Sequence, residues 1–196
     1  CELDKIYTAD YYYVKFFDSD NGVIVCGYAK SNDTNESSRI YSTSNGGESW
    51  DIVGSGPATN IIKGVVYVSS DVGFFCYDYV EGMDSNLYKT DDGGKTFAKV
   101  MLEEQELDSS AANPQGQETE TKTDSGKNGA DSSEQLRWGD VYKEALTPVV
   151  DSTGIITIYL TQGKNAVYND GKTAAKYQSS DKGSTWKYIG QVEIKD

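Results

Sequence analysis

Thr43-Ser44-Asn45-Gly46-Gly47-Glu48-Ser49-Trp50 decides the fold, because two later stretches of the chain repeat its pattern. The second copy is Thr90-Asp91-Asp92-Gly93-Gly94-Lys95-Thr96-Phe97, and the third is Ser179-Ser180-Asp181-Lys182-Gly183-Ser184-Thr185-Trp186. Glycine supplies the positive φ of a tight turn, and the Asp or Asn side chain accepts hydrogen bonds from the turn's own amides. The aromatic ring that ends each copy is expected to pack beneath the hairpin. The pattern therefore predicts three equivalent strand-turn-strand units.

The order Ser/Thr-x-Asp-x-Gly-x-Ser/Thr-Trp/Phe resembles the Asp-box, or bacterial neuraminidase repeat, of sialidases and of many non-enzymatic β-propellers. Residues 16–27 followed by Arg39-Ile40-Tyr41-Ser42 also resemble propellers related to the photosystem II stability/assembly factor. Asn45 departs from the usual Asp, and a neutral amide accepts a weaker hydrogen bond than a carboxylate, so the first turn should be the loosest. The repeat positions expected to fix the three turns are Asn45, Gly47, Trp50, Asp92, Gly94, Phe97, Asp181, Gly183 and Trp186.

Each repeat should form one blade of a propeller. The predicted fold class is all-β, with three four-stranded antiparallel blades in a single domain over 1–196. The blades should cover about 8–55, 58–102 and 140–194, with the repeat turn between the third and fourth strands of each. The expected strands are 11–18, 22–29, 39–44 and 49–53, then 61–69, 73–79, 86–90 and 96–102, then 142–150, 154–161, 174–179 and 185–192.

The spacing between the second and third repeats is almost twice that between the first and second. The excess lies at 103–135, which is rich in Asp, Glu, Ser, Gly, Asn and Thr and has no aromatic residue. We expect a disordered acidic insertion, because such a composition buries too little apolar area to offset its ordering entropy. Closed propellers need about four to eight blades. We therefore expect either a longer parent chain or a homodimer that supplies the missing blades.

Composition excludes several classes of protein. The net charge is −13 and the pI is about 4.4, which argues against nucleic acid and anionic membranes as partners, because both reward a basic face. No apolar run reaches the ~18 residues of a transmembrane helix. The chain has no His, so Ser-His-Asp triads and Cys-His dyads are excluded, and no metal site or cofactor is expected.

The three cysteines have separate interpretations. Cys1 resembles the lipid-bearing first residue of a mature bacterial lipoprotein, which implies an extracellular or cell-surface location; an incidental cysteine is the alternative. Cys26 lies four residues after Gly22, whereas Cys76 lies three after Gly73. Side chains alternate between the two faces of a strand, so these thiols should be buried separately rather than joined in a disulfide.

The sialidase resemblance implies three arginines that clamp the substrate carboxylate. This chain has only Arg39 and Arg137. Lysine cannot replace a guanidinium in a bidentate clamp, so sialidase activity is not expected.

The connections between second and third strands should share one face of the propeller with the insertion. They carry paired acids beside tyrosines, which suit sugar binding, although solvated surface acids are the plainer interpretation. The same oxygen-rich loops, 81–84 and 32–36, could supply calcium ligands, but neither has the spacing of a calcium loop. The candidate binding residues are Tyr79, Glu81, Asp84, Trp138, Tyr168 and Asp170.

The sequence thus predicts a non-catalytic, exported propeller of a bacterial cell surface that binds or assembles a protein or a glycan. The alternative is a carbohydrate-active glycoside hydrolase with a two-carboxylate mechanism, whose site is incomplete in this chain.

Overall fold

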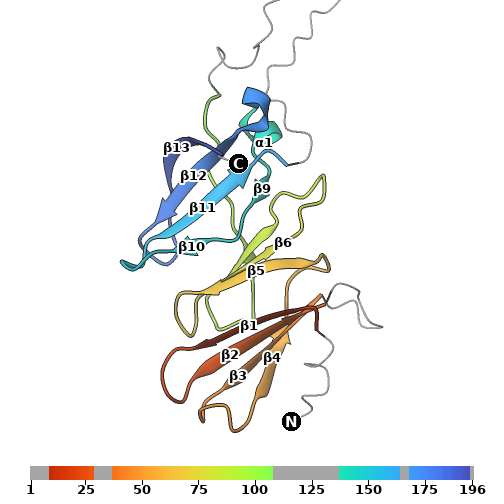
Figure 1. Cartoon of the computed structure of the whole chain (residues 1–196), viewed down its shortest axis with the longest axis vertical. Helices are drawn as coiled ribbons and strands as arrows, with labels where there is room; N and C mark the ends of the chain where they lie inside the picture. Colours follow the sequence, from red (N-terminus) through yellow and green to blue (C-terminus); the bar gives the residue numbers. More distant parts are fainter. Residues whose placement is uncertain (1–8, 29–36, 108–136, 164–167, 195–196) are drawn as a thin grey trace, which may run out of the picture.

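The computed structural model describes residues 9–28, 37–107, 137–163 and 168–194. Three antiparallel sheets follow one another along the chain and along the long axis of the molecule (Figure 1). The first sheet has the order β1 (Tyr11–Phe16), β2 (Gly22–Gly27), β3 (Ser38–Thr43) and β4 (Asp51–Ser55). The second has the order β5 (Ile62–Tyr67), β6 (Gly73–Tyr77), β7 (Leu87–Thr90) and β8 (Ala98–Lys99). The predicted all-β class with three blade-like sheets is confirmed.

The third sheet differs from the expected four strands. Its order is β10 (Val149–Val150), β11 (Ile156–Thr161), β12 (Thr173–Ser179) and β13 (Lys187–Glu193), and β9 (Glu144–Ala145) also pairs with β11. The prediction of one continuous strand over 142–150 was wrong. Pro148 lies between β9 and β10, and proline has no N–H to donate to a strand ladder. The segment before β9 forms a short helix, α1 (Trp138–Val141), and η3 (Tyr168–Gly171) precedes β12.

The three repeat turns connect the third and fourth strands of their sheets, as predicted. Asp92 Oδ1 accepts hydrogen bonds from the backbone N–H groups of Lys95 (3.0 Å) and Thr96 (2.9 Å), and Asp92 Oδ2 accepts one from Thr96 Oγ1 (2.6 Å). Asp181 accepts the equivalent bonds in the third turn, including one from Thr185 Oγ1 at 2.6 Å. Each carboxylate therefore closes its turn through several bonds at once.

Asn45 closes the first turn with its amide. Asn45 Oδ1 accepts a hydrogen bond from the backbone N–H of Ser49 (3.0 Å), and Asn45 Nδ2 donates to Ser49 Oγ (2.9 Å). The second bond runs in the opposite direction to that in the other turns, and no charge takes part. The first turn therefore has the same shape as the others with weaker acceptors.

The aromatic ring of each repeat packs as predicted, and always on the same side of its sheet. Phe97 lies edge-on to Phe75, with ring centroids 4.9 Å apart, in the core between the first and second sheets. Trp186 lies edge-on to Phe74 at 6.0 Å, in the core between the second and third sheets. Phe97 and Trp186 thus help to seal their sheets against the preceding ones, whereas Trp50 lies edge-on to Phe16 of its own sheet, with ring centroids 5.9 Å apart.

Tyrosines of β1 also join the first sheet to the second. The hydroxyl oxygens of Tyr11 and Tyr13 accept hydrogen bonds from the backbone N–H groups of Val65 and Tyr67, both at 3.1 Å. β5 is the outermost strand of its sheet, so these N–H groups have no neighbouring strand to bond. The phenols satisfy them and protect an edge that would otherwise invite pairing.

Asn86 joins the second sheet to the third. Its side chain donates to the carbonyl oxygens of Tyr77 (2.8 Å) and Ala145 (3.0 Å) and accepts from the N–H of Ala145 (2.8 Å). Asn86 is 1% exposed, so water cannot replace these partners. One amide therefore fixes β9 against the second sheet.

We predict that Asn86→Ala will lower the free energy of unfolding by about 2–4 kcal/mol, because it leaves buried backbone groups of Ala145 without partners. Urea denaturation measures the change. Asn60→Ala is the matched control, since Asn60 Nδ2 donates to a single carbonyl, that of Asp78, at 3.0 Å and is only part-buried. An equal loss in both variants would contradict the role given to Asn86.

The repeat turns predict a pH dependence. Hydrogen bonds from Thr96 and Thr185 hold the pKa of Asp92 and Asp181 well below the ordinary 3.8. A lowered folded pKa stabilises the protein above the ordinary value, and that contribution is lost as the pH falls below it. Asn45→Asp should therefore raise the melting temperature at pH 7, with a gain that shrinks at about pH 3. Calorimetry at both pH values measures this, and a gain independent of pH would contradict it.

Several predictions concern residues outside the described ranges. These are the lipid on Cys1, the calcium ligands at 32–36 and the insertion, except for residues 103–107, which have no helix or strand. Within the described ranges, Cys26 and Cys76 are both free and buried, in different cores, as expected. Burial raises the pKa of the Cys26 thiol to about 11 and that of Cys76 to about 12, so neither is a reactive thiolate at neutral pH.

Candidate functional site

A cavity of about 480 Å³ lies between the second and third sheets. The connection between β6 and β7, the segment after β8, α1 and the start of β9 form its walls, so it lies at the end of the strands opposite the repeat turns. Its polar and aromatic lining includes Tyr79, Glu81, Asp84, Asn86, Glu104, Arg137, Trp138, Asp140, Tyr142 and Lys143. Glu104, near the start of the predicted insertion, and Arg137, which follows its end, therefore border the same hollow as the loop between β6 and β7.

Four of the six candidate binding residues line this cavity, namely Tyr79, Glu81, Asp84 and Trp138. The other two do not. Tyr168 is 1% exposed, and its ring packs edge-on to Tyr142 with centroids 6.2 Å apart. Asp170 is exposed in η3, where its φ of 54° lies in the left-handed region. The third sheet contributes α1 and β9 to the cavity instead of the connection between β11 and β12.

Lysines hold two of the acidic side chains in place. Lys143 Nζ donates to Glu81 Oε1 at 2.8 Å. This bond links the residue just before β9 to the loop between β6 and β7. Lys99 Nζ donates to Asp84 Oδ2 at 2.8 Å. The hydrogen bond and the charge of Lys99 lower the pKa of Asp84, and those of Glu81 raise the pKa of Lys143. These shifts favour the charged forms of Asp84 and Lys143.

The aromatic lining divides into a buried wall and one accessible ring. Trp138 is 4% exposed and packs on Tyr142 and Tyr188, with ring centroids 4.7 and 5.3 Å apart. Tyr142 is 3% exposed, and its hydroxyl lies 2.9 Å from Thr173 Oγ1. Trp138 thus anchors the chain as it enters the third sheet. Tyr79, which is half-buried, is the lining aromatic that a ligand can reach.

Sequence reasoning missed Lys143 and Asn86. Lys143 lies 62 residues from its partner Glu81, and Asn86 lies 59 residues from Ala145, so no local pattern links either pair. A lysine before a broken strand and an asparagine before β7 look like ordinary surface residues in the sequence. Arg137, one of the two arginines of the chain, also lines the cavity.

Metal and membrane signals are not found in the part of the chain that the structure describes. No group of three or more Cys, Asp or Glu side chains in those ranges could hold a metal ion. The described helices include none that is long and apolar enough to cross a membrane.

Comparison with known proteins gives a distant likeness. No protein-family model matches the chain, and no curated protein matches it. Among the solved structures that match is the Niastella koreensis GH74 enzyme NkGH74, with a TM-score of 0.42 and 15% sequence identity. The match covers 85% of this chain and 19% of that enzyme, so the chain spans less than a fifth of its length. A likeness at this level carries no argument about activity.

We predict that Lys99→Met will raise the pKa of Asp84 toward its ordinary 3.8, because Lys99 supplies the hydrogen bond and the charge that lower it. NMR titration of the side-chain carboxyl carbons measures the shift. Lys63→Met is the matched control, since Lys63 Nζ pairs with Asp78 Oδ1 at 2.7 Å instead. An Asp84 titration that is the same in Lys99→Met and in the parent would contradict the pairing.

Proposed function

We propose that this protein is a non-catalytic binding platform of the cell surface and that the cavity between its second and third sheets binds the ligand, a glycan or a protein segment. The observation that carries the proposal is the half-buried ring of Tyr79 beside carboxylates that lysines hold in fixed positions. The cavity volume of about 480 Å³ lies within the roughly 300–1,000 Å³ of ordinary ligand sites.

A neutral glycan fits this lining best. An aromatic ring can stack on the apolar face of a sugar, and ionised pairs offer both donors and acceptors to its hydroxyl groups. Four acidic residues line the cavity, against the two basic residues Arg137 and Lys143. This excess of negative charge disfavours sialic acids and other anionic sugars. The acidic lining residues are Glu81, Asp84, Glu104 and Asp140.

A glycoside hydrolase is the second candidate, because carboxylates line the cavity. Its general acid must be protonated near neutral pH, which requires a raised pKa. Lys99 lowers the pKa of Asp84, and Lys143 is bonded to Glu81. These two ion pairs favour binding over catalysis.

The extracellular location and the lipid on Cys1 are parts of the same proposal. They are supported by the sequence resemblance alone. Mass spectrometry of the protein isolated from its own cells tests both, because acyl chains add a defined mass to the first residue.

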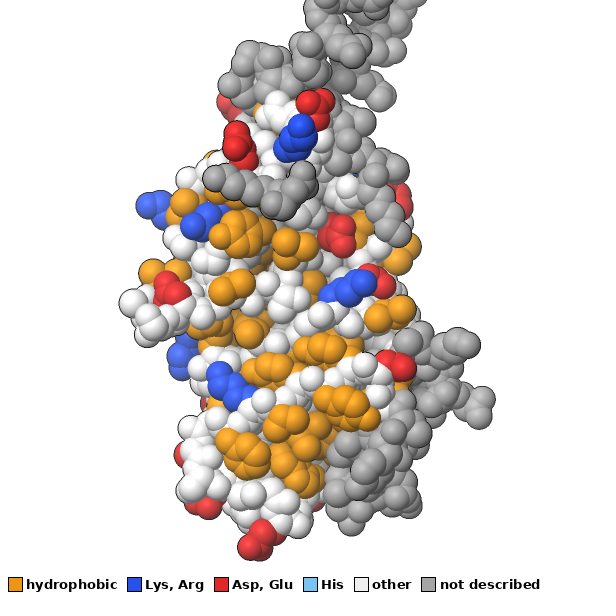
Figure 2. All heavy atoms as spheres, viewed as in Figure 1, with side chains coloured by type: hydrophobic (Ala, Val, Ile, Leu, Met, Phe, Trp, Pro, Cys, Tyr) orange, Lys and Arg blue, Asp and Glu red, His pale blue; other side chains and the backbone are white. Residues whose placement is uncertain are grey.

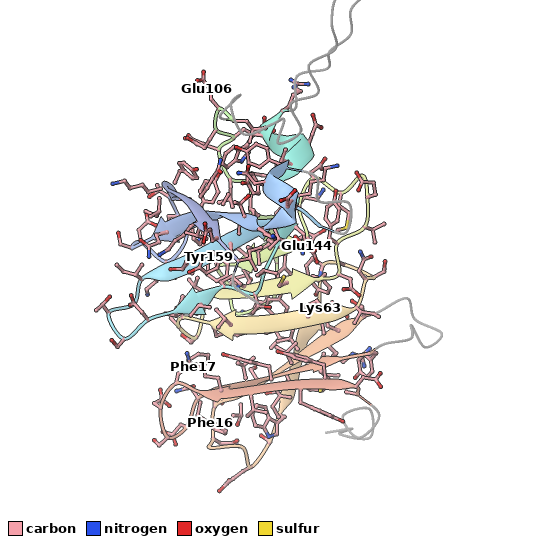
Figure 3. The ribbon with its side chains drawn as sticks, turned by 45° about the horizontal axis from the view of Figure 1, so that its top comes forward. Phe16, Phe17, Lys63, Glu106, Glu144 and Tyr159 are labelled. Atoms are coloured by element: carbon pink, nitrogen blue, oxygen red, sulfur yellow. The ribbon has the colours of Figure 1, made fainter. Side chains whose placement is uncertain are left out.

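We predict that Tyr79→Ala will weaken binding of a neutral oligosaccharide at least tenfold, because it removes the reachable ring. A panel of immobilised neutral, amino and acidic oligosaccharides identifies the probe, and calorimetry measures the affinity. Tyr159→Ala is the control, since Tyr159 lies on β11 outside the cavity lining (Figure 3). Equal affinity in both variants, or binding of acidic sugars alone, would contradict the proposed site.

The two candidate functions separate in one assay. Glu81→Gln and Asp84→Asn should leave most of the oligosaccharide binding intact, and neither they nor the parent should release reducing ends. Release of reducing ends by the parent, lost in both variants, would establish the hydrolase instead.

A further inference from the structure

Both methionines of the chain line the cavity between the second and third sheets. Met83 lies in the loop between β6 and β7, and Met101 lies in the segment after β8. Met101 is 63% exposed, whereas Met83 is partly buried. A thioether is flexible and apolar until it takes up an oxygen atom, which makes it polar. Oxidation of either side chain therefore changes the lining of this cavity.

The sulfur atom of Met83 closes the loop between β6 and β7. Met83 Sδ accepts hydrogen bonds from the backbone N–H of Val80 at 3.4 Å and from Asn60 Nδ2 at 3.3 Å. The backbone N–H of Met83 donates to the carbonyl oxygen of Val80 at 3.1 Å, so these two residues are bonded twice. Gly82, with a φ of 92°, allows the tight turn between them. Glu81 lies on the same turn.

Asn60 fixes both ends of this loop. Besides its bond to Met83, Asn60 Nδ2 donates to the carbonyl oxygen of Asp78 at 3.0 Å. The N–H of Asp78 in turn donates at 2.8 Å to the carbonyl oxygen of Ile61, the residue before β5. Tyr79, the reachable ring of the cavity, lies between Asp78 and Met83 in the chain. The position of Tyr79 therefore depends on an acceptor, the thioether, that oxidation changes.

The two cysteines of the described ranges are buried. Cys26 is 0% exposed and Cys76 is 1% exposed. Burial raises the pKa of both thiols, so neither supplies the thiolate that reacts with oxidants. Figure 2 shows hydrophobic side chains gathered over the first sheet, but the exposed ones of β1, Tyr12, Val14 and Phe16, have no sulfur. Within the described part of the chain, a hydroperoxide therefore meets its reactive sulfur atoms in the cavity.

We propose that Met83 is a site of reversible oxidation, at which a hydroperoxide forms the sulfoxide, loosens the loop of Tyr79 and weakens ligand binding in the cavity. The effect on affinity rests on the proposed function, whereas the effect on the loop does not. Met101 reacts first, because it is exposed and its sulfur accepts no hydrogen bond from the described residues. Met83 reacts more slowly, because it is partly buried and its sulfur already accepts two.

The reaction needs no group besides the thioether and the hydroperoxide. The sulfur attacks one peroxide oxygen, an S–O bond forms and the O–O bond breaks. With hydrogen peroxide, the proton of the transferred oxygen passes to the leaving oxygen, which departs as water. The thioether loses two electrons and the peroxide gains them. Methionine sulfoxide reductases remove the oxygen again, with thiols as the electron donors, so the modification is reversible.

Oxidation of Met83 displaces both of its hydrogen-bond donors. The nitrogen atoms of Val80 and Asn60 lie 3.4 and 3.3 Å from the sulfur. An N–H···O bond alone spans about 2.9 Å, so an oxygen placed between the sulfur and a donor nitrogen pushes the two apart. Oxidation of Met101 moves no such donor in the described ranges. It makes the cavity wall more polar and leaves the loop in place.

Two variants separate the methionines. Met83→Leu and Met101→Leu each remove one thioether and nearly conserve the side-chain volume, so both should fold. Circular dichroism confirms that each variant keeps its sheets. During treatment of the parent with hydrogen peroxide, peptide mass spectrometry should show Met101 gaining oxygen at least about tenfold faster than Met83.

The loop is measured first without a ligand. In Met101→Leu, oxidation of Met83 should shift the NMR signals of the Val80 N–H and of the Asn60 side-chain amide, and methionine sulfoxide reductase should restore them. In Met83→Leu, peroxide should leave both signals where they were before treatment. On the same treatment, the dissociation constant of the neutral oligosaccharide should rise at least about tenfold in Met101→Leu and change less than about twofold in Met83→Leu.

Three outcomes overturn the proposal. Oxidised Met83 with unchanged Val80 and Asn60 signals would show that the thioether does not hold the loop. Shifted signals with unchanged affinity in a protein that binds the oligosaccharide would make the oxidation incidental. An equal loss of affinity in oxidised Met83→Leu would assign the effect to Met101. If the untreated parent binds no oligosaccharide, the proposed function fails, and the NMR signals still decide whether oxidation releases the loop.

Discussion

The amide of Asn86 is the contact on which the candidate site depends. It bonds both backbone groups of Ala145 and the carbonyl of Tyr77, and it is fully enclosed between two sheets. Because β9 is only two residues long, its own ladder bonds with β11 do little to position it. The amide supplies the missing constraint, and the cavity lies directly beside it. The affinity of a ligand for this cavity should therefore depend on how the second and third sheets pack.

Each of the two sheet-to-sheet interfaces joins two apolar faces of different origin. One face carries the ring of its own repeat turn, Phe97 in the second sheet and Trp186 in the third. The other face belongs to the preceding sheet and packs against that ring. This arrangement lets sheets stack without limit until a face becomes polar. The outer face of the third sheet mixes Thr157, Lys176 and Gln178 with the exposed Val149, whereas β1 exposes Tyr12, Val14 and Phe16. The same packing rule thus accounts for the two internal cores.

Local sequence patterns predicted the elements whose geometry is local. The repeat turns follow from hydroxyl, carboxylate and glycine spacing, since the hydrogen bonds of their Asp, Asn, Ser and Thr side chains lie within five residues. Strand alternation placed Cys26 and Cys76 on opposite faces without reference to the rest of the fold. The prediction of one continuous strand over 142–150 was wrong because Pro148 interrupts the ladder of hydrogen bonds. A hydrophobic pattern alone does not reveal that one N–H group is missing.

The sequence by itself determined an all-β chain of three equivalent sheets and drew attention to the loop that carries Tyr79, Glu81 and Asp84. Turn chemistry and alternation act over a few residues, so they can be read directly. Only the tertiary structure decided which residues share the cavity, because Lys143 and Glu81 meet across two sheets. It buried Trp138, kept Tyr168 and Asp170 out of the site, and left the side chain of Val14 exposed. These outcomes follow from how sheets pack, which depends on contacts between residues far apart in the chain.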